Sequence, residues 1–138
     1  MTPEPDDGAM PDMGSLLGMA MDMQQQLLAA QEQAAAAVVE EVRPERILHL
    51  AGQSSVHLSW LDPGGTMRTN VLGIVHLLDA VRRQGLRPAV LVVGSAEEYG
   101  AVAPAEMPIR EETPLRPASP YAVSKVAQGA LALPPPSA

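Results

Sequence analysis

Residues 89–100, AVLVVGSAEEYG, join the strongest strand pattern of the chain to a short polar segment. Five consecutive apolar residues at 89–93, three of them Val, predict a strand buried in a parallel sheet. The polar segment 94–100 follows at the carboxyl end of that strand, which is where open α/β sheets bind their ligands. The stretch therefore predicts an α/β fold with a site at this end of the sheet.

A second buried strand is predicted upstream, at residues 46–50. Its sequence RILHL is a short apolar run that leads into Ala51, Gly52 and Gln53. Small residues allow a ligand to approach the backbone closely. An ordinary turn between a strand and a helix explains the same residues, so both interpretations stay open here.

A helix is predicted between the two strands. Residues 62–65, DPGG, predict a turn, residues 66–84 an amphipathic helix, and Gly85 the C′ position that ends it. Asn70 is the only Asn of the chain and falls in mid-helix, where Asn has poor propensity. We expect it either to bridge to a neighbouring loop or to face solvent. The side chains predicted to face inward are Val71, Ile74, Val75, Leu78 and Val81.

Downstream, residues 119–125 read SPYAVSK and predict the start of another helix, with Ser119 as N-cap and Pro120 in the first turn. Tyr121 and Lys125 are four residues apart, so both lie on one face of such a helix. An ammonium beside a phenol favours the phenolate, which can exchange a proton with an alcohol or carbonyl. Lys125 is also the only lysine of the chain. A solvated pair on a surface helix is the alternative explanation of this spacing.

The N-terminal part differs in composition from the rest. We predict a disordered tail over residues 1–14, a long amphipathic helix over 15–42, a partial Rossmann-like domain over 43–133 and a disordered end over 134–138. Pro44 disfavours helix at Arg43 and so ends the helix. One apolar stripe of the helix is predicted to pack on a partner helix: Ala20, Met23, Leu27, Ala30, Ala34 and Ala37.

Composition excludes several classes of function. The 138 residues suffice for one domain at most and include no Cys, and the spacing of the three His predicts no metal site. Residues 1–42 carry a net charge of −8 and residues 43–138 one of +1, so the sequence offers no basic surface for nucleic acid. No apolar run predicts a membrane span or a signal peptide, and we expect a cytoplasmic location.

The order of these motifs resembles the extended short-chain dehydrogenase/reductase family. Within it, the nucleotide-sugar epimerase/dehydratase branch is most similar, and above all the GDP-mannose 4,6-dehydratases. The resemblance spans roughly residues 36–130. It rests on four segments: 48–56, 69–73, 93–100 and 120–128.

The resemblance implies a role for each matching residue. It makes Tyr121 the acid/base at the sugar O4, and it makes Lys125 the group that binds the nicotinamide ribose hydroxyls. Ser95 matches a residue that hydrogen-bonds the reacting oxygen, and Glu97 matches the glutamate that removes the C5 proton. Ala51, Gly52 and Gln53 match the loop that lines the cofactor. The implied substrate is a nucleotide sugar, GDP-mannose first, and the implied cofactor is NADP or NAD.

Two departures from the family pattern qualify this expectation. Ala96 stands where the dehydratases carry a residue that can give a proton to the leaving hydroxyl, which leaves a reductase or an epimerase open. The Gly-rich turn that holds the pyrophosphate in this family does not occur in the sequence. We therefore expect a truncated gene product, or an internal fragment of a doubly wound parallel sheet joined to an unrelated helix. As an isolated chain it should be inactive or nearly so, marginally stable and self-associating.

Two alternatives from other classes remain at this point. Residues 12–28 resemble the first helix of small bacterial nucleoid-associated proteins of the YbaB type, which would imply DNA binding. The second alternative is an oligomerisation remnant without catalytic activity, held together by the Ala- and Met-rich helix.

Overall fold

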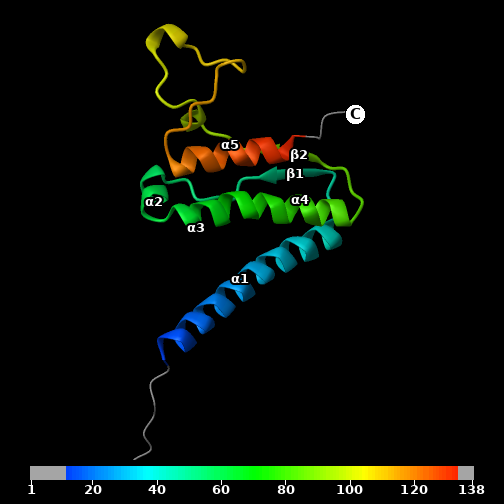
Figure 1. Ribbon diagram of the computed structural model, residues 1–138. Helices are drawn as coiled ribbons and strands as arrows, with labels where there is room; N and C mark the ends of the chain where they lie inside the picture. Colours follow the sequence, from blue (N-terminus) through cyan, green and yellow to red (C-terminus); the bar gives the residue numbers. More distant parts are fainter. Residues whose placement is uncertain (1–11, 134–138) are drawn as a thin grey trace, which may run out of the picture.

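The computed structural model describes residues 12–133, so most of the tail predicted at 1–14 and the whole end predicted at 134–138 lie outside the described residues. Figure 1 shows the order of the helices and strands along the chain. They are α1 (Met13–Val42), β1 (Arg46–His49), α2 (Val56–Leu61), α3 (Pro63–Met67), a π-helical turn (Arg68–Leu72), α4 (Gly73–Arg83), β2 (Ala89–Val92), 3-10 turns at Ala96–Tyr99 and Pro104–Glu106, and α5 (Pro120–Ala132).

The long helix α1 begins two residues earlier than predicted, at Met13 instead of Ser15. The side chain of Asp12 caps it, since its Oδ1 accepts a hydrogen bond of 2.6 Å from the Ser15 amide. At its other end Arg43 adopts a left-handed conformation with φ 43°, directly before Pro44, so the helix ends where the sequence predicts.

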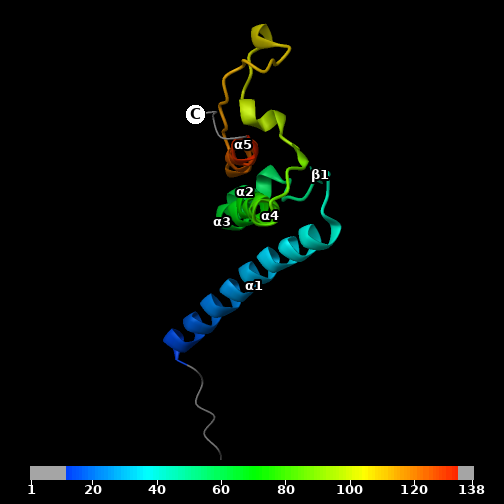
Figure 2. The same cartoon turned by 90° about the vertical axis from the view of Figure 1, so that its right-hand side faces the viewer.

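The face on which α1 packs is not the predicted one. Every member of the predicted stripe, from Ala20 to Ala37, is exposed. The contact with α4 is made instead by Ala36 and the buried Val39, and an ion pair of 2.8 Å joins Glu32 to Arg83. Figures 1 and 2 show why: only the C-terminal part of α1 lies along α4, and the helix runs away from it toward its N-terminus.

The two strands form a parallel pair in which Leu48 lies beside Leu91. Their side chains alternate between exposed and half-buried, so one face of the pair is covered and the other is bare. In Figure 2, α4 and α5 lie on the same side of β1. The core on this side is centred on the buried residues Val39, Ala80 and Val81, and half-buried apolar side chains complete it: Ala36, Ile47, Leu77 and Leu86.

The segment between the strands is helical over a longer range than predicted. The predicted turn at 62–65 is wrong, because Asp62 caps α3 through a 2.8 Å bond from the Gly65 amide and Pro63 starts the helix. The chain stays helical to Arg83, with a π-helical turn at 68–72, and Gly85 follows with φ 62°, as predicted. Of the side chains expected to face inward, Ile74 and Val81 are buried and the others half-buried.

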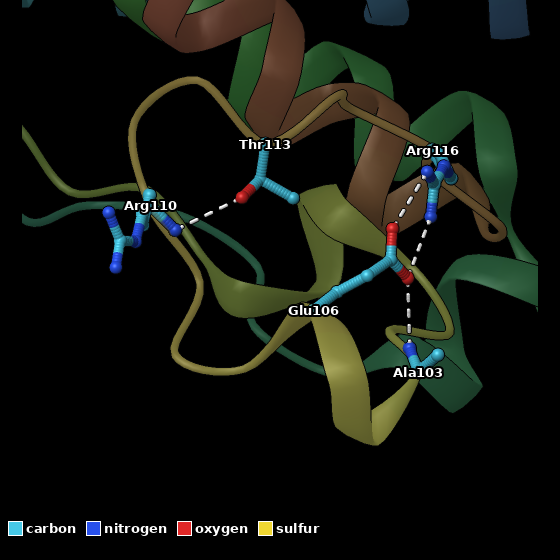
Figure 3. Close-up of polar contacts among 5 residues, drawn as sticks. All are labelled: Ala103, Glu106, Arg110, Thr113 and Arg116. Atoms are coloured by element: carbon cyan, nitrogen blue, oxygen red, sulfur yellow. Dashed lines mark hydrogen bonds and ion pairs between the residues drawn. The ribbon is translucent and has the colours of Figure 1, made fainter.

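The loop between the 3-10 turn at 96–99 and α5 is held by its own polar contacts (Figure 3). Arg116 binds both carboxylate oxygens of Glu106 at 3.0 and 3.3 Å, and Glu106 accepts a third bond from the Ala103 amide. These contacts lower the pKa of Glu106, and the hydrogen bond from Arg116 contributes most to this effect. Arg110 and Thr113 close a further turn in the same loop.

Candidate active site

The start of α5 is built as predicted. Ser119 Oγ accepts a 3.1 Å hydrogen bond from the Ala122 amide, and Pro120 occupies the first turn. Both side chains of the predicted pair are buried, since Tyr121 is 7% exposed and Lys125 is 9% exposed. The alternative of a solvated surface pair is therefore wrong.

Lys125 reaches the carboxyl end of β2. Its Nζ donates a 3.0 Å hydrogen bond to the Val93 carbonyl and lies 5.9 Å from the centroid of the Tyr121 ring, within cation–π range. A Cβ on Gly52 would lie 3.9 Å from the same Nζ and 3.0 Å from Asn70 Oδ1. Gly52 therefore allows the loop after β1 to pass closely beside Asn70, at ordinary contact distance from the lysine. Among residues 12–133 the ammonium makes no ion pair with a carboxylate.

Asn70 joins three segments at this point and is fully buried. Its Oδ1 accepts from the Gln53 amide at 2.8 Å, while its Nδ2 donates to the Gln53 carbonyl at 3.1 Å and to Ser124 Oγ at 2.8 Å. The bridging expectation is thus confirmed, and the exposed alternative is wrong. The sequence did not mark Asn70 as a site residue; its signal was a lone Asn in mid-helix, and it sits in the π-helical turn.

Ser95 and Glu97 follow β2 at the same edge of the sheet. Ser95 Oγ accepts a 3.3 Å hydrogen bond from the Glu97 amide, while its own amide donates to Glu98 Oε1 at 2.7 Å. Ser95 is half-buried, and Glu97 is exposed. Within residues 12–133 neither side chain hydrogen-bonds to Tyr121 or Lys125. Their convergence on one reacting group therefore stays a prediction.

A cavity of about 330 Å³ opens beside the loop after β1. Ala51 and Gly52 line it together with His49, and α1 closes another side with Gln31 and Ala35. Gln53 points elsewhere, since its Nε2 donates to the Ser55 carbonyl at 2.9 Å and to Thr66 Oγ1 at 3.2 Å. The pKa of His49 is lowered mainly by burial and further by the charge of the nearby Lys125 ammonium.

The described residues contain neither a metal-binding cluster nor a helix suited to a bilayer. No group of three or more His, Asp or Glu side chains between residues 12 and 133 is placed to hold a metal ion. In the same part of the chain, no helix combines the length and the apolar character that a bilayer span requires.

Comparison with known proteins identifies a family that is similar in sequence over most of the chain. A family model described as GDP-mannose 4,6 dehydratase matches residues 24–133. The chain is 42% identical over 90 residues to GDP-6-deoxy-D-mannose reductase from Pseudomonas aeruginosa. These 90 residues cover 65% of this chain and 30% of that protein.

Solved structures show the same relationship. RMD from Pseudomonas aeruginosa, complexed with NADPH, is similar with a TM-score of 0.62 and 42% identity, over 64% of this chain and 30% of that chain. UDP-glucose 4-epimerase from Thermus thermophilus, complexed with NAD, is similar with a TM-score of 0.67 and 35% identity, over 72% of this chain and 32% of that chain. The chain thus spans about a third of the length of the relatives it matches.

The match also decides between interpretations of α1. We expected an unrelated helix before the α/β part. The match to the family model begins at residue 24, so the second half of α1 belongs to the family and this expectation is wrong for that half. The DNA-binding alternative of the YbaB type is not supported. With a match over most of its length and neighbours of the short-chain dehydrogenase/reductase fold, the chain belongs to the GDP-mannose 4,6 dehydratase family.

Proposed function

We propose that the chain supplies the proton-transferring part of an NAD(P)-dependent enzyme that modifies a nucleotide sugar, with a 4,6-dehydratase as the first candidate. The observation that carries the proposal is the buried Tyr121–Lys125 pair, held against the Val93 carbonyl at the carboxyl end of β2. A lysine buried without a carboxylate partner is costly, which favours a functional reason for its position.

The residues present fit part of a dinucleotide. Gly52 lies beside Asn70, where a Cβ would come within 3.0 Å of Oδ1, and the Lys125 ammonium and the cavity of about 330 Å³ adjoin the same loop. In this proposal Lys125 donates to ribose hydroxyls, while Ala51 and Gly52 line the cofactor. Gln53 supports that loop through Asn70. A bound nicotinamide would supply the hydride transfer.

The remaining roles concern the sugar. Tyr121 would take and return the proton of the reacting hydroxyl. Ser95 Oγ accepts from the Glu97 amide, which leaves its own proton free to donate to the reacting oxygen. Glu97 is exposed and would remove the proton beside the carbonyl. Relatives named as a reductase and as an epimerase keep these two reactions as alternatives.

Isothermal titration with NADPH, NADH and GDP-mannose tests the proposal on the full chain. We expect weak cofactor binding, which Lys125→Met reduces at least tenfold because the ribose loses its ammonium donor. Arg82→Met is the matched control, since Arg82 is an exposed cation on α4 away from the cavity. Equal binding by both variants, or a lack of any binding by the unmodified chain, would contradict the proposal.

Association of α1 with a second copy is a second candidate function. Large apolar side chains in its first half are exposed, among them Met13 at 82% and Met23 at 71%. Deleting residues 1–26 removes this half and leaves Ala36 and Val39 in the core. Sedimentation velocity should then show a smaller assembly; an unchanged size would dismiss this role for the helix.

A further inference from the structure

The inward face of α5 carries one more buried polar group beyond Lys125. Gln128 is 1% exposed, and its Nε2 lies 3.4 Å from His49 Nε2 at the end of β1. Its Oε1 is buried and has no hydrogen-bond partner among residues 12–133. Since an amide NH₂ can only donate, His49 Nε2 must be the acceptor and carry no proton.

We propose that Gln128 is a positioning residue that holds His49 as a neutral imidazole with its proton on Nδ1, so that no second positive charge forms beside Lys125. Protonation of His49 would place a proton on Nε2, and Nε2 could then no longer accept from Gln128. The amide therefore opposes the charged form through a direct contact.

The surroundings of His49 favour the same state. From α5 it faces the Lys125 ammonium, and the cavity that it lines also includes His76 of α4. The cavity residues from α1, Gln31 and Ala35, carry no charge. None of these neighbours is a carboxylate that would stabilise an imidazolium, so neutral His49 is the form with the lower cost.

Turning the amide of Gln128 over would give the opposite tautomer. Oε1 would then accept from a proton on His49 Nε2. The NH₂ group would then take the present place of Oε1. In the structure Nε2, and not Oε1, faces His49, and this orientation matches the tautomer with the proton on Nδ1.

The tautomer has a consequence for ligand choice, which rests on the proposed function. His49 lines the cavity beside Ala51 and Gly52. With Nε2 engaged and the proton on Nδ1, the ring can offer a ligand a donor but not an acceptor. The cavity should accordingly prefer a ligand that presents an acceptor atom to His49.

Nitrogen-15 NMR of the three histidines in the labelled full chain tests the inference. At pH 7 we expect the His49 proton on Nδ1, with exposed His57 as internal reference. Gln128→Met removes the donor at similar size, so the pKa of His49 should rise by about 0.5 to 1, the equivalent of one hydrogen bond. Gln26→Met, on the exposed part of α1, is the matched control and should leave His49 unchanged.

A His49 proton on Nε2 in the unmodified chain would overturn the inference, and so would an unchanged pKa in a folded Gln128→Met variant. If that variant does not fold, the tautomer of the unmodified chain decides alone. The measurement needs no cofactor. Failure of NADPH and NADH to bind, with His49 in the expected tautomer, would therefore count against the proposed function only.

Discussion

At the scale of single residues, the buried side chain of Asn70 joins separate segments of the site through three hydrogen bonds. One amide fixes both backbone groups of Gln53 and the hydroxyl of Ser124, so it connects the loop after β1 with the inward face of α5. Ser124 Oγ in turn donates to the Tyr121 carbonyl at 2.7 Å. The position of the Tyr121 turn thus depends on a side chain from another helix.

Replacing Asn70 with Ala should cost about 2 kcal/mol of the free energy of unfolding, because buried partners lose their bonds. Urea denaturation measures this cost. Thr69→Ala changes the exposed neighbour in the same helical turn and should stay within about 0.5 kcal/mol of the unmodified chain. Equal effects of the two substitutions would show that the Asn70 bridge contributes nothing to stability.

Gly100 allows the loop that precedes α5 to return to the sheet. It has φ 64° and ψ −143°, and a Cβ would collide with the Arg116 carbonyl. The Arg116 amide donates to the Glu98 carbonyl at 2.9 Å, so this crossing ties the loop beside the candidate site. A side chain at position 100 would have to separate these two parts of the loop.

Gly100→Ala should therefore lower the free energy of unfolding by at least about 2 kcal/mol, through backbone strain and the collision. The same change at Gly129 of α5 meets no atom within 4 Å and should raise stability by up to about 1 kcal/mol, because Ala is the better helix former. Thermal unfolding distinguishes the two. A shared sign of the two effects would contradict the geometry around residue 100.

At the scale of elements, local signals predicted the positions of helix ends and strands better than their contacts. Ser119 and Pro120 define the start of α5 through bonds to their own neighbours, and Gly85 ends α4 by its own conformation. The packing face of α1 could not be predicted in this way. Ala and Met occur all around that helix, so the face that packs depends on where α4 lies, which is not a local property.

Two adjacent valines test the face of α1 that packs. Val39 is 3% exposed and Val38 is 60% exposed. Val39→Ala should cost about 2 kcal/mol because it leaves a cavity against Ala80 and Val81. Val38→Ala should be neutral or stabilising by about 0.5 kcal/mol through helix propensity. Chemical denaturation measures the free energy of unfolding of both variants. A larger cost for Val38→Ala than for Val39→Ala would contradict the packing of Val39 against α4.

The same limit applies to the candidate site. Tyr121 and Lys125 could be predicted because four residues of helix bring them together. The contacts from Lys125 to Val93 and from Gln128 to His49 join residues 32 and 79 positions apart. Such contacts depend on how α5 lies across the strands, which no local pattern contains. The sequence therefore left the bridge from Asn70 as one of two alternatives and did not indicate Gln128, and the structure was needed to connect both residues to the site.

At the scale of the whole molecule, the described residues form part of a Rossmann-like sheet together with the helices that cover one of its faces. Within residues 12–133 the sheet has two strands, and the helices cover one of its faces. On the other face Leu48 and Leu91 are 63% and 57% exposed and lie side by side in the parallel register. A bare apolar face next to unpaired strand edges is a surface on which chains associate.

We expect the full chain to sediment as a concentration-dependent mixture, and a double substitution on the bare face to shift it toward monomer. Leu48→Lys with Leu91→Glu removes both apolar side chains while placing opposite charges next to each other, so strand pairing should survive. Leu61→Glu with Leu115→Lys makes the same change at exposed positions off the sheet and should leave the assembly unchanged. If deletion of residues 1–26 reduces the size of the assembly and the double substitution does not, the chains associate through α1. A monomer at every concentration would show that the bare face attracts no second copy.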